Sequence, residues 1–101
     1  MGFLFNIYFM RKFSNVVFEN YKNLSWTVLD GKLQKNFKFD NFDKAIEFIN
    51  KVAELSKSEN HHPEILNIYN QVTISLFTHD QNKITELDQE MSKKIDDLFN
   101  I

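Results

Sequence analysis

Residues 25–40 read SWTVLDGKLQKNFKFD, and this stretch decides the fold. It contains an Asp-Gly pair at positions 30 and 31, which is a strong signal for a β-hairpin because both residues tolerate the positive φ angles of a tight turn. After the turn, apolar side chains alternate with polar ones from Leu33 to Phe39, as they do in a strand with one buried face. Lys35 breaks this alternation, which is common on an edge strand. We therefore predict a β-hairpin here.

The apolar spacing becomes helical on both sides of the hairpin. Before it, residues 13–24 carry apolar side chains at loosely helical intervals. After it, residues 41–56 show the helical period more clearly, and Asp40 or Asn41 is suited to cap this helix, with Asp43 in its first turn. The apolar positions of this second helix are Phe42, Ala45, Ile46, Ile49, Val52 and Ala53.

Residues 65–80, ILNIYNQVTISLFTHD, return to extended structure and predict two further strands. The segment from Asn67 to Asn70 can supply the turn between them, because asparagine adopts turn conformations readily. After the turn, side chains at alternate positions face opposite ways. One face holds Val72, Ile74 and Leu76, and the other holds Thr73, Ser75, Phe77 and His79.

Residues 83–99, KITELDQEMSKKIDDLF, predict a final helix. Thr85 and Asp88 lie three positions apart, as in a capping box in which Asp replaces the usual Glu. The apolar stripe of this helix consists of Leu87, Met91, Ile95 and Leu98. The full order is then helix, two strands, helix, two strands, helix. This order predicts an α+β fold, in which helices pack on one face of a four-stranded antiparallel sheet, within a single domain over residues 1–101.

The composition limits the class of protein. The chain has 101 residues, of which 43% are hydrophobic and 15% aromatic, with 11 phenylalanines, so we expect a folded globule with a phenylalanine-rich core. The net charge is −2 and Arg11 is the only arginine, so nothing indicates a nucleic-acid partner. The chain has no cysteine, which excludes disulfides, thiolate zinc sites and a cysteine nucleophile, and which fits an intracellular, cytoplasmic protein.

The chain begins with the apolar stretch MGFLFNIYFM, followed by Arg11 and Lys12. This stretch is shorter than the ~20 apolar residues that cross a bilayer, and it lacks the basic start and the small-residue cleavage site of a signal peptide. Asn6 stands where a myristoylation pattern needs Ser or Thr. We expect residues 1–12 to form an extra apolar segment that packs on the core or contacts another copy, with a targeting role as the alternative.

Two of the three histidines are adjacent in residues 59–65, ENHHPEI, directly before the only proline, Pro63. The residue before a proline favours extended backbone, so His62 should be extended and should point away from His61. His79 follows in the next strand but one, and an antiparallel return of the chain could bring it beside the pair. Imidazoles from different segments would then converge on one small site.

Three interpretations of these histidines are open from the residues alone. The side chains can have ordinary structural partners. They can bind a metal together with Asp80, Glu59 or Glu64, although adjacent histidines rarely share one ion and no HExxH spacing is present. They can also act as acid and base, because imidazole is the side chain that titrates near neutral pH.

The histidines belong to a set of motifs that agree in order and spacing. These are Trp26, the run LQKNFKFDNFDKAIEFINKVA of residues 33–53, the His-His-Pro of residues 61–63, an aromatic residue at Tyr69, the Thr-His of residues 78 and 79, and Asp88. Together they resemble the pterin-4a-carbinolamine dehydratase family over roughly residues 20–98.

The resemblance implies a hydro-lyase that needs no metal or other cofactor. Such an enzyme removes water from the 4a-carbinolamine of a tetrahydropterin and gives the quinonoid dihydropterin in tetrahydrobiopterin recycling. The resemblance implies His61 and His79 as the acid and the base, in an order that it leaves open, and His62 as a residue that binds and positions the pterin. The other residues implied to line the substrate site are Asn60, Phe77, Thr78 and Asp80. Asp88 would cap the last helix or orient a histidine.

Two positions depart from the family pattern near this site. The loop DQNKIT of residues 80–85 lacks the usual glycine, and we expect Asn82 to take its left-handed turn conformation. Lys57 stands where many relatives carry an acid, so a carboxylate at that position cannot support His61 here.

The alternative function is non-catalytic: a pterin-binding protein, or a module that stabilises dimers of a transcription factor, as some members of the family do. The last helix is the candidate surface for such a partner. The resemblance and an unpaired sheet edge also imply a homodimer or homotetramer, with Leu98, Phe99 and Ile101 as part of the contact. No nucleic-acid or membrane partner is expected.

Overall fold

The computed structural model describes residues 25–100 of the chain. The predicted helix over residues 13–24, the apolar segment 1–12 and Ile101 lie outside the described residues. The elements follow one another in the order β2 (Thr27–Leu29), β3 (Lys32–Lys38), α1 (Phe42–Glu59), β4 (Glu64–Ile68), β5 (Gln71–Leu76) and α2 (Glu86–Phe99).

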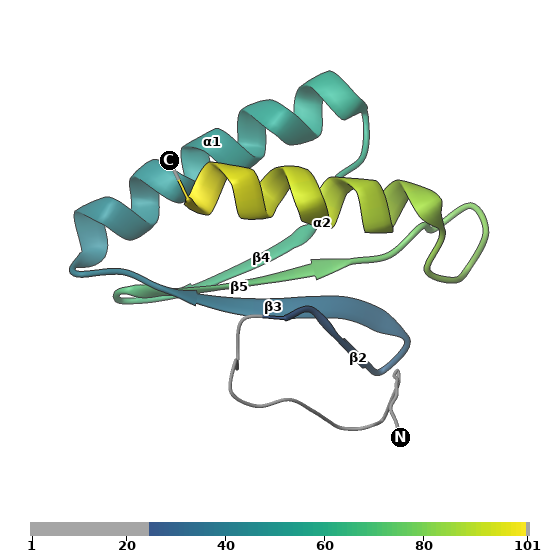
Figure 1. Ribbon diagram of the computed structural model, residues 1–101, viewed down its shortest axis with the longest axis horizontal. Coiled ribbons are helices and arrows are strands. Elements are labelled where there is room, and N and C mark those ends of the chain that lie inside the picture. Colours follow the sequence, from purple (N-terminus) through teal and green to yellow (C-terminus); the bar gives the residue numbers. More distant parts are fainter. Residues whose placement is uncertain (1–24, 101) are drawn as a thin grey trace.

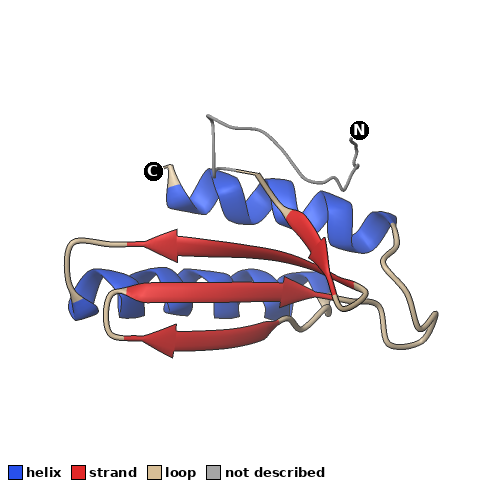
Figure 2. Cartoon of the chain, turned by 90° about the horizontal axis from the view of Figure 1, so that it is seen from below, coloured by secondary structure: helices blue, strands red, loops and turns tan. Residues whose placement is uncertain are grey.

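The four strands form one antiparallel sheet in the order β2-β3-β5-β4. Both helices lie on the same face of this sheet (Figure 1), and in the view from below the strands pass in front of the helices (Figure 2). The predicted α+β fold, a four-stranded antiparallel sheet with helices on one face, is therefore confirmed.

The first hairpin has the predicted turn. Leu29 pairs with Lys32 across it, and both residues between them have positive φ, 54° at Asp30 and 76° at Gly31. Positive φ at both central positions is characteristic of a type I′ turn, whose twist matches that of the flanking strands. The Asp-Gly pair therefore sets the register of β2 against β3.

The second hairpin turns at Tyr69 and Asn70, inside the predicted segment. Tyr69 has a φ of 52°, and the Asn67 side chain stabilises the turn by donating to the carbonyl oxygens of Tyr69 at 3.1 Å and Gln71 at 3.0 Å. The Asn70 side chain donates to the carbonyl oxygen of Phe39 at 2.8 Å, which ties this turn to the end of β3.

The prediction that Lys35 marks an edge strand is wrong. β3 lies between β2 and β5, so it is an inner strand. The Lys35 side chain is only 9% exposed, and its Nζ lies 2.8 Å from Oδ1 of Asp96 on α2 and 5.0 Å from the ring centroid of Phe37. Lysine can occupy this helix-facing position because its long apolar stem packs on the core while its ammonium group finds a carboxylate.

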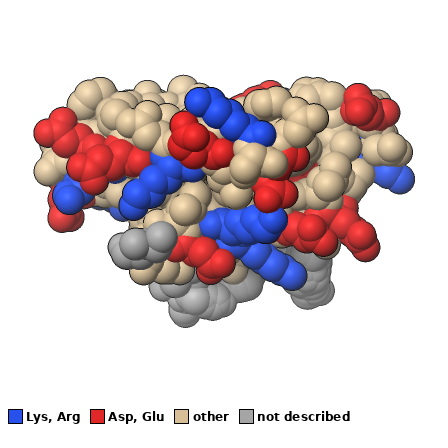
Figure 3. Space-filling model, turned by 90° about the horizontal axis from the view of Figure 1, so that it is seen from above, with Lys and Arg blue, Asp and Glu red and all other residues tan. Residues whose placement is uncertain are grey.

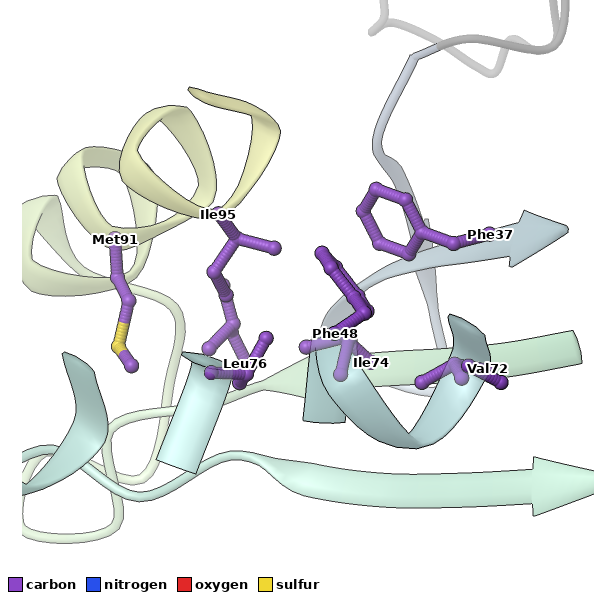
Figure 4. Packing of buried hydrophobic residues seen from close by; sticks show 9 residues of the cluster. Phe37, Phe48, Val72, Ile74, Leu76, Met91 and Ile95 are labelled. Atoms are coloured by element: carbon purple, nitrogen blue, oxygen red, sulfur yellow. The ribbon is translucent and has the colours of Figure 1, made fainter. Parts of the chain in front are cut away.

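The core lies between the sheet and the two helices (Figure 4). Its buried members are Phe37 of β3, Ala45, Phe48 and Val52 of α1, Val72, Ile74 and Leu76 of β5, and Met91 and Ile95 of α2. The face of β5 predicted from its alternation supplies three of these residues, each without exposed surface. Phe37 lies in a cluster of rings, with its centroid 4.8 Å from that of Phe48 and 5.1 Å from that of Phe99.

The first helix starts as predicted. Asn41 caps α1, and its Oδ1 accepts a hydrogen bond from the Lys44 N–H at 2.9 Å. Phe42, which was predicted on the apolar stripe, is 46% exposed, whereas Phe48 is buried. The prediction for Phe42 is wrong because this residue is the first of the helix and does not reach the core.

The apolar stripe of α2 is also shorter than predicted. Met91 and Ile95 are buried and Leu98 packs against them, but Leu87 is 56% exposed. Asp88 has no exposed surface, so it takes the inward position of the first turn. The prediction that Leu87 belongs to the stripe is wrong for this reason.

The outer face of the helices carries acidic and basic side chains close to one another, and neither sign dominates it (Figure 3). Neither of the two described helices is long and apolar enough to cross a membrane.

Candidate active site

The histidine pair lies where α1 ends. Asn60 adopts the left-handed conformation, with φ of 53° and ψ of 42°, and asparagine takes this conformation more readily than most residues. The N–H of His61 then donates to the carbonyl oxygen of Ser56 at 3.1 Å. Pro63 follows, and β4 begins at Glu64. The backbone is therefore restrained on both sides of the two histidines.

His61 contacts a buried carboxylate. Its Nε2 lies 2.6 Å from Oδ1 of Asp88, the His61 side chain is 13% exposed, and the Asp88 side chain has no exposed surface. A carboxylate can only accept hydrogen bonds, so Nε2 carries the hydrogen in this contact. Nδ1 is then the ring nitrogen that is left for another partner.

Asp88 receives two further hydrogen bonds, both on its other oxygen. The Thr78 hydroxyl donates to Oδ2 at 2.7 Å, and the Thr85 N–H donates to the same atom at 2.9 Å. The second bond is half of the predicted capping box, which starts α2. Asp88 therefore both caps the helix and contacts a histidine, one carboxylate oxygen for each.

A tight turn carries the chain from β5 to α2. Thr78 and Lys83 form a bridge across it, and the Thr78 N–H donates to the Lys83 carbonyl oxygen at 3.1 Å. Asn82 has a φ of 56°, so the prediction that it takes the left-handed conformation is confirmed. β5 ends at Leu76, so the prediction that His79 lies on a strand is wrong and His79 is part of the turn.

The other two histidines are exposed. The His79 ring lies 5.3 Å from the Phe77 ring between centroids, at an interplanar angle of 78°. If the register in which Glu64 pairs with Ser75 is continued beyond the end of β4, His62 falls opposite Phe77. His61 turns towards Asp88 on the helix side of the sheet, and alternation along an extended chain would place His62 on the other side, which stays a prediction.

Five of the predicted site residues thus fall into two groups. His61, Asp88 and Thr78 form one hydrogen-bonded network, and Phe77 and His79 form an aromatic pair. The side chains of Asn60, His62 and Asp80 make no hydrogen bond within residues 25–100, and each is exposed. In that part of the chain, no three His, Asp or Glu side chains lie close enough together to hold a metal ion.

The network also includes Thr85, which the sequence indicated only as a helix cap. The hydroxyl oxygens of Thr85 and Thr78 lie 2.7 Å apart. The signal for the cap was the Thr-x-x-Asp spacing, but no local pattern indicates the contact to Thr78, because that residue belongs to another element.

Ion pairs lie beside this end of the molecule. Nζ of Lys94 on α2 lies 2.7 Å from the Glu59 carboxylate in the last turn of α1, and this hydrogen bond raises the pKa of Lys94. Lys57 pairs with Glu54 on the surface of α1. The carboxylate that contacts His61 therefore comes from α2, while Lys57 of α1 is paired with a neighbour on its own helix.

The fold and the site together define a class: an α+β protein whose sheet carries both helices on one face, with a histidine–carboxylate pair where α1 ends and α2 begins. Comparison with known proteins makes the assignment more specific. The family model described as pterin 4 alpha carbinolamine dehydratase matches residues 14–98. The chain belongs to this family.

Individual relatives agree with the family model. A protein of Sulfurisphaera tokodaii named for this family is 43% identical over 78 residues, which are 77% of this chain and 84% of that protein. A protein of Prochlorococcus marinus strain NATL2A with the same family name is 47% identical over 79 residues, 78% of this chain and 83% of the other.

Solved structures show the same fold. The crystal structure of a transcriptional coactivator/pterin dehydratase from Brucella melitensis superposes with a TM-score of 0.70 at 36% identity, over 74% of this chain and 82% of that one. A pterin dehydratase-like protein described as a RuBisCO assembly factor in the alpha-carboxysome superposes with a TM-score of 0.65, over 74% of this chain and 89% of that one. Its identity is 24%, so this second likeness concerns the fold alone.

Proposed function

We propose that this protein removes water from 4a-hydroxytetrahydropterin, the 4a-carbinolamine, and releases quinonoid dihydropterin, as a step in tetrahydrobiopterin recycling. Membership of the family supports the reaction and the substrate class. The observation that carries the mechanism is the 2.6 Å contact between His61 Nε2 and Asp88 Oδ1. Among residues 25–100, this contact is the only hydrogen bond of the His61 ring, so Nδ1 is available to a ligand.

The reaction requires one acid and one base. The C4a–O bond breaks, and the oxygen leaves as water because it takes a proton from an imidazolium. N5 loses its proton to a neutral imidazole, and the electron pair of that N–H bond forms the C4a=N5 double bond. The protein donates one proton to the leaving oxygen and accepts one from N5, so the step needs no oxidant or reductant. We propose that it uses no metal or other cofactor.

His61 and His79 are the proposed acid and base, and His62 is proposed to bind and position the pterin. Asp88 would keep the hydrogen of neutral His61 on Nε2 and would stabilise its imidazolium form, as the carboxylate does in a Ser-His-Asp triad. Nδ1 of His61 can then accept a proton or, after protonation, donate one.

The remaining predicted residues would act in different ways. The Phe77 ring, beside His79, offers an apolar surface to the flat pterin. Asn60 and Asp80 are exposed and can reach a bound ligand. The polar groups of Thr78 are already paired, its N–H and carbonyl oxygen with Lys83 and its hydroxyl with Asp88, so Thr78 would act through its neighbours.

The direct test is a turnover assay with freshly generated carbinolamine, in which the formation of quinonoid dihydropterin is followed against the uncatalysed reaction. We expect acceleration by the intact protein and a large loss of it in His61→Ala. Binding of the pterin without any acceleration would contradict the dehydratase function and would favour a non-catalytic pterin-binding protein.

A coactivator-type function is the second candidate, because the related structure from Brucella melitensis carries that description. The apolar stripe of α2 does not favour it, since Met91 and Ile95 are buried in the core of the protomer itself. A partner helix would have to use exposed residues such as Leu87. The turnover assay separates this candidate from the enzyme.

We also propose a homodimer or homotetramer, and a cytoplasmic location. The contact was predicted at Leu98 and Phe99, but Leu98 packs on the core and Phe99 lies in the ring cluster, so charged residues there would also destabilise the fold. The edge strand β4 offers a better contact. It has one unpaired side within the described sheet and carries three exposed apolar side chains, Ile65, Leu66 and Ile68.

A further inference from the structure

We infer that Thr78 and Thr85 are positioning residues, whose hydroxyl groups hold Asp88 so that it fixes the tautomer and the orientation of His61. The consequence for catalysis rests on the proposed function. The effect on His61 itself does not, because it can be measured without turnover.

Each hydrogen bond between Thr85, Thr78 and Asp88 has a defined donor and acceptor. Thr78 has a single hydroxyl hydrogen, and a carboxylate can only accept, so this hydrogen goes to Oδ2 of Asp88. The contact of 2.7 Å between the two hydroxyl groups must then be donated by Thr85. Thr85 Oγ1 in turn accepts from the Leu87 N–H at 3.3 Å. All these bonds therefore run in one direction, from the backbone of α2 to the carboxylate.

Thr78 and Asp88 are both buried. Thr78 is 7% exposed and Asp88 has no exposed surface, so solvent does not readily replace a hydroxyl that is removed. Without the Thr78 hydroxyl, Oδ2 would keep only the Thr85 N–H as a partner. The carboxylate could then rotate about the Cβ–Cγ bond of Asp88, and its Oδ1 would no longer hold His61 Nε2 in one position.

The N-terminal cap of α1 is simpler than that of α2. Asn41 caps α1 with one hydrogen bond, to the Lys44 N–H, and it is exposed. Its side chain contacts nothing in the His61 network. The cap of α2 differs because the Thr85 hydroxyl continues to Thr78 and from there to the carboxylate. This continuation is not needed to start a helix, which indicates a second use for it.

The experiment uses variants of matched shape. Thr78→Val and Thr85→Val remove a hydroxyl and keep the branched side chain, Thr78→Ser and Thr85→Ser keep the hydroxyl, and Asn41→Ala removes a helix cap far from the network. Long-range ¹H–¹⁵N spectra at a pH above the histidine range report which nitrogen of His61 carries the hydrogen. The same preparations are tested for dehydration of fresh carbinolamine.

We expect the valine variants to lose the uniform Nε2–H form of His61 and to lower kcat by about tenfold, with little change in KM, because misplacing a reacting group by ~1 Å can cost up to ~10² in rate. The serine variants should restore both signals. Asn41→Ala should reduce thermal stability and leave the His61 signals unchanged.

Two outcomes would overturn the inference. One is an unchanged Nε2–H signal in Thr78→Val, and the other is valine variants that lose stability as Asn41→Ala does without any change at His61. Thr78→Val decides the matter even if Thr85→Val does not fold, because it removes none of the groups that form the two cap hydrogen bonds of α2. If the intact protein shows no dehydration but the spectra change as expected, the proposed function fails and the inference stands.

Discussion

Asp88→Asn keeps the size of the buried side chain but leaves it with one acceptor oxygen. If that oxygen stays at the Oδ2 position, it still accepts from Thr78 and from the Thr85 N–H, and the amide NH₂ then faces Nε2 of His61 at 2.6 Å. A donor there forces the hydrogen of neutral His61 onto Nδ1. In the opposite orientation, the NH₂ group meets the N–H of Thr85 and leaves buried donors unpaired, which costs ~1–3 kcal/mol.

That cost favours the first orientation, so most molecules of the variant should hold His61 in the wrong tautomer. An acid–base group contributes ~10²–10⁴ to the rate, and we expect kcat to fall by a factor within this range. The free energy of unfolding should also fall, by about 1 kcal/mol, because hydrogen bonds to an ionised carboxylate are replaced by weaker bonds to a neutral amide. The measurements are initial rates on fresh carbinolamine and unfolding in urea.

Asp96→Asn is the matched control, since it makes the same change on the same helix. Asp96 accepts from Lys35 and from the Trp26 ring N–H, and it has no contact with His61. We expect this variant to lose stability and to keep its kcat. A folded Asp88→Asn protein that turns over as fast as the Asp96→Asn protein would refute the role given to the carboxylate.

Three further predictions concern other parts of the proposal. His79→Ala should lower kcat by ~10²–10⁴ with little change in the free energy of unfolding, because His79 is exposed; full turnover would remove it from the mechanism. Exhaustive chelation should leave the activity unchanged, and loss of activity that zinc restores would contradict the metal-free reaction. Leu66→Glu combined with Ile68→Lys should reduce the particle size in light scattering, and a monomer for the unmodified protein at micromolar concentration would contradict the proposed assembly.

Most of the local structure could be predicted from the sequence, because short-range signals determine it. The Asp-Gly turn, the Asn41 cap, the Thr85–Asp88 capping box and the alternation in β5 all appear as expected. The placement of Lys35 could not be predicted. It depends on the pairing of β3 with β5, which joins residues on either side of α1, and on a carboxylate from α2.

The residues of the candidate site could be named from the sequence, but the contacts between them could not be predicted. The histidines and Asp88 follow from motifs, yet His61 and Asp88 lie 27 positions apart and on different elements. A pattern of apolar residues also assigns the inward position of the first turn of α2 to Leu87, because such a pattern treats Asp as a surface residue. Only the partners of Asp88 explain why a carboxylate is buried there instead.

The shared use of Asp88 has an evolutionary consequence. One of its oxygens caps α2 and the other contacts His61, so we expect a mutation at this position to harm folding even in a descendant that does not need the proposed reaction. A descendant that lost catalysis would therefore be free to lose the exposed histidines long before it lost the Thr-x-x-Asp of α2. The presence of that motif in a divergent sequence indicates that the fold has been inherited, and only the histidines can indicate whether the chemistry has been inherited with it.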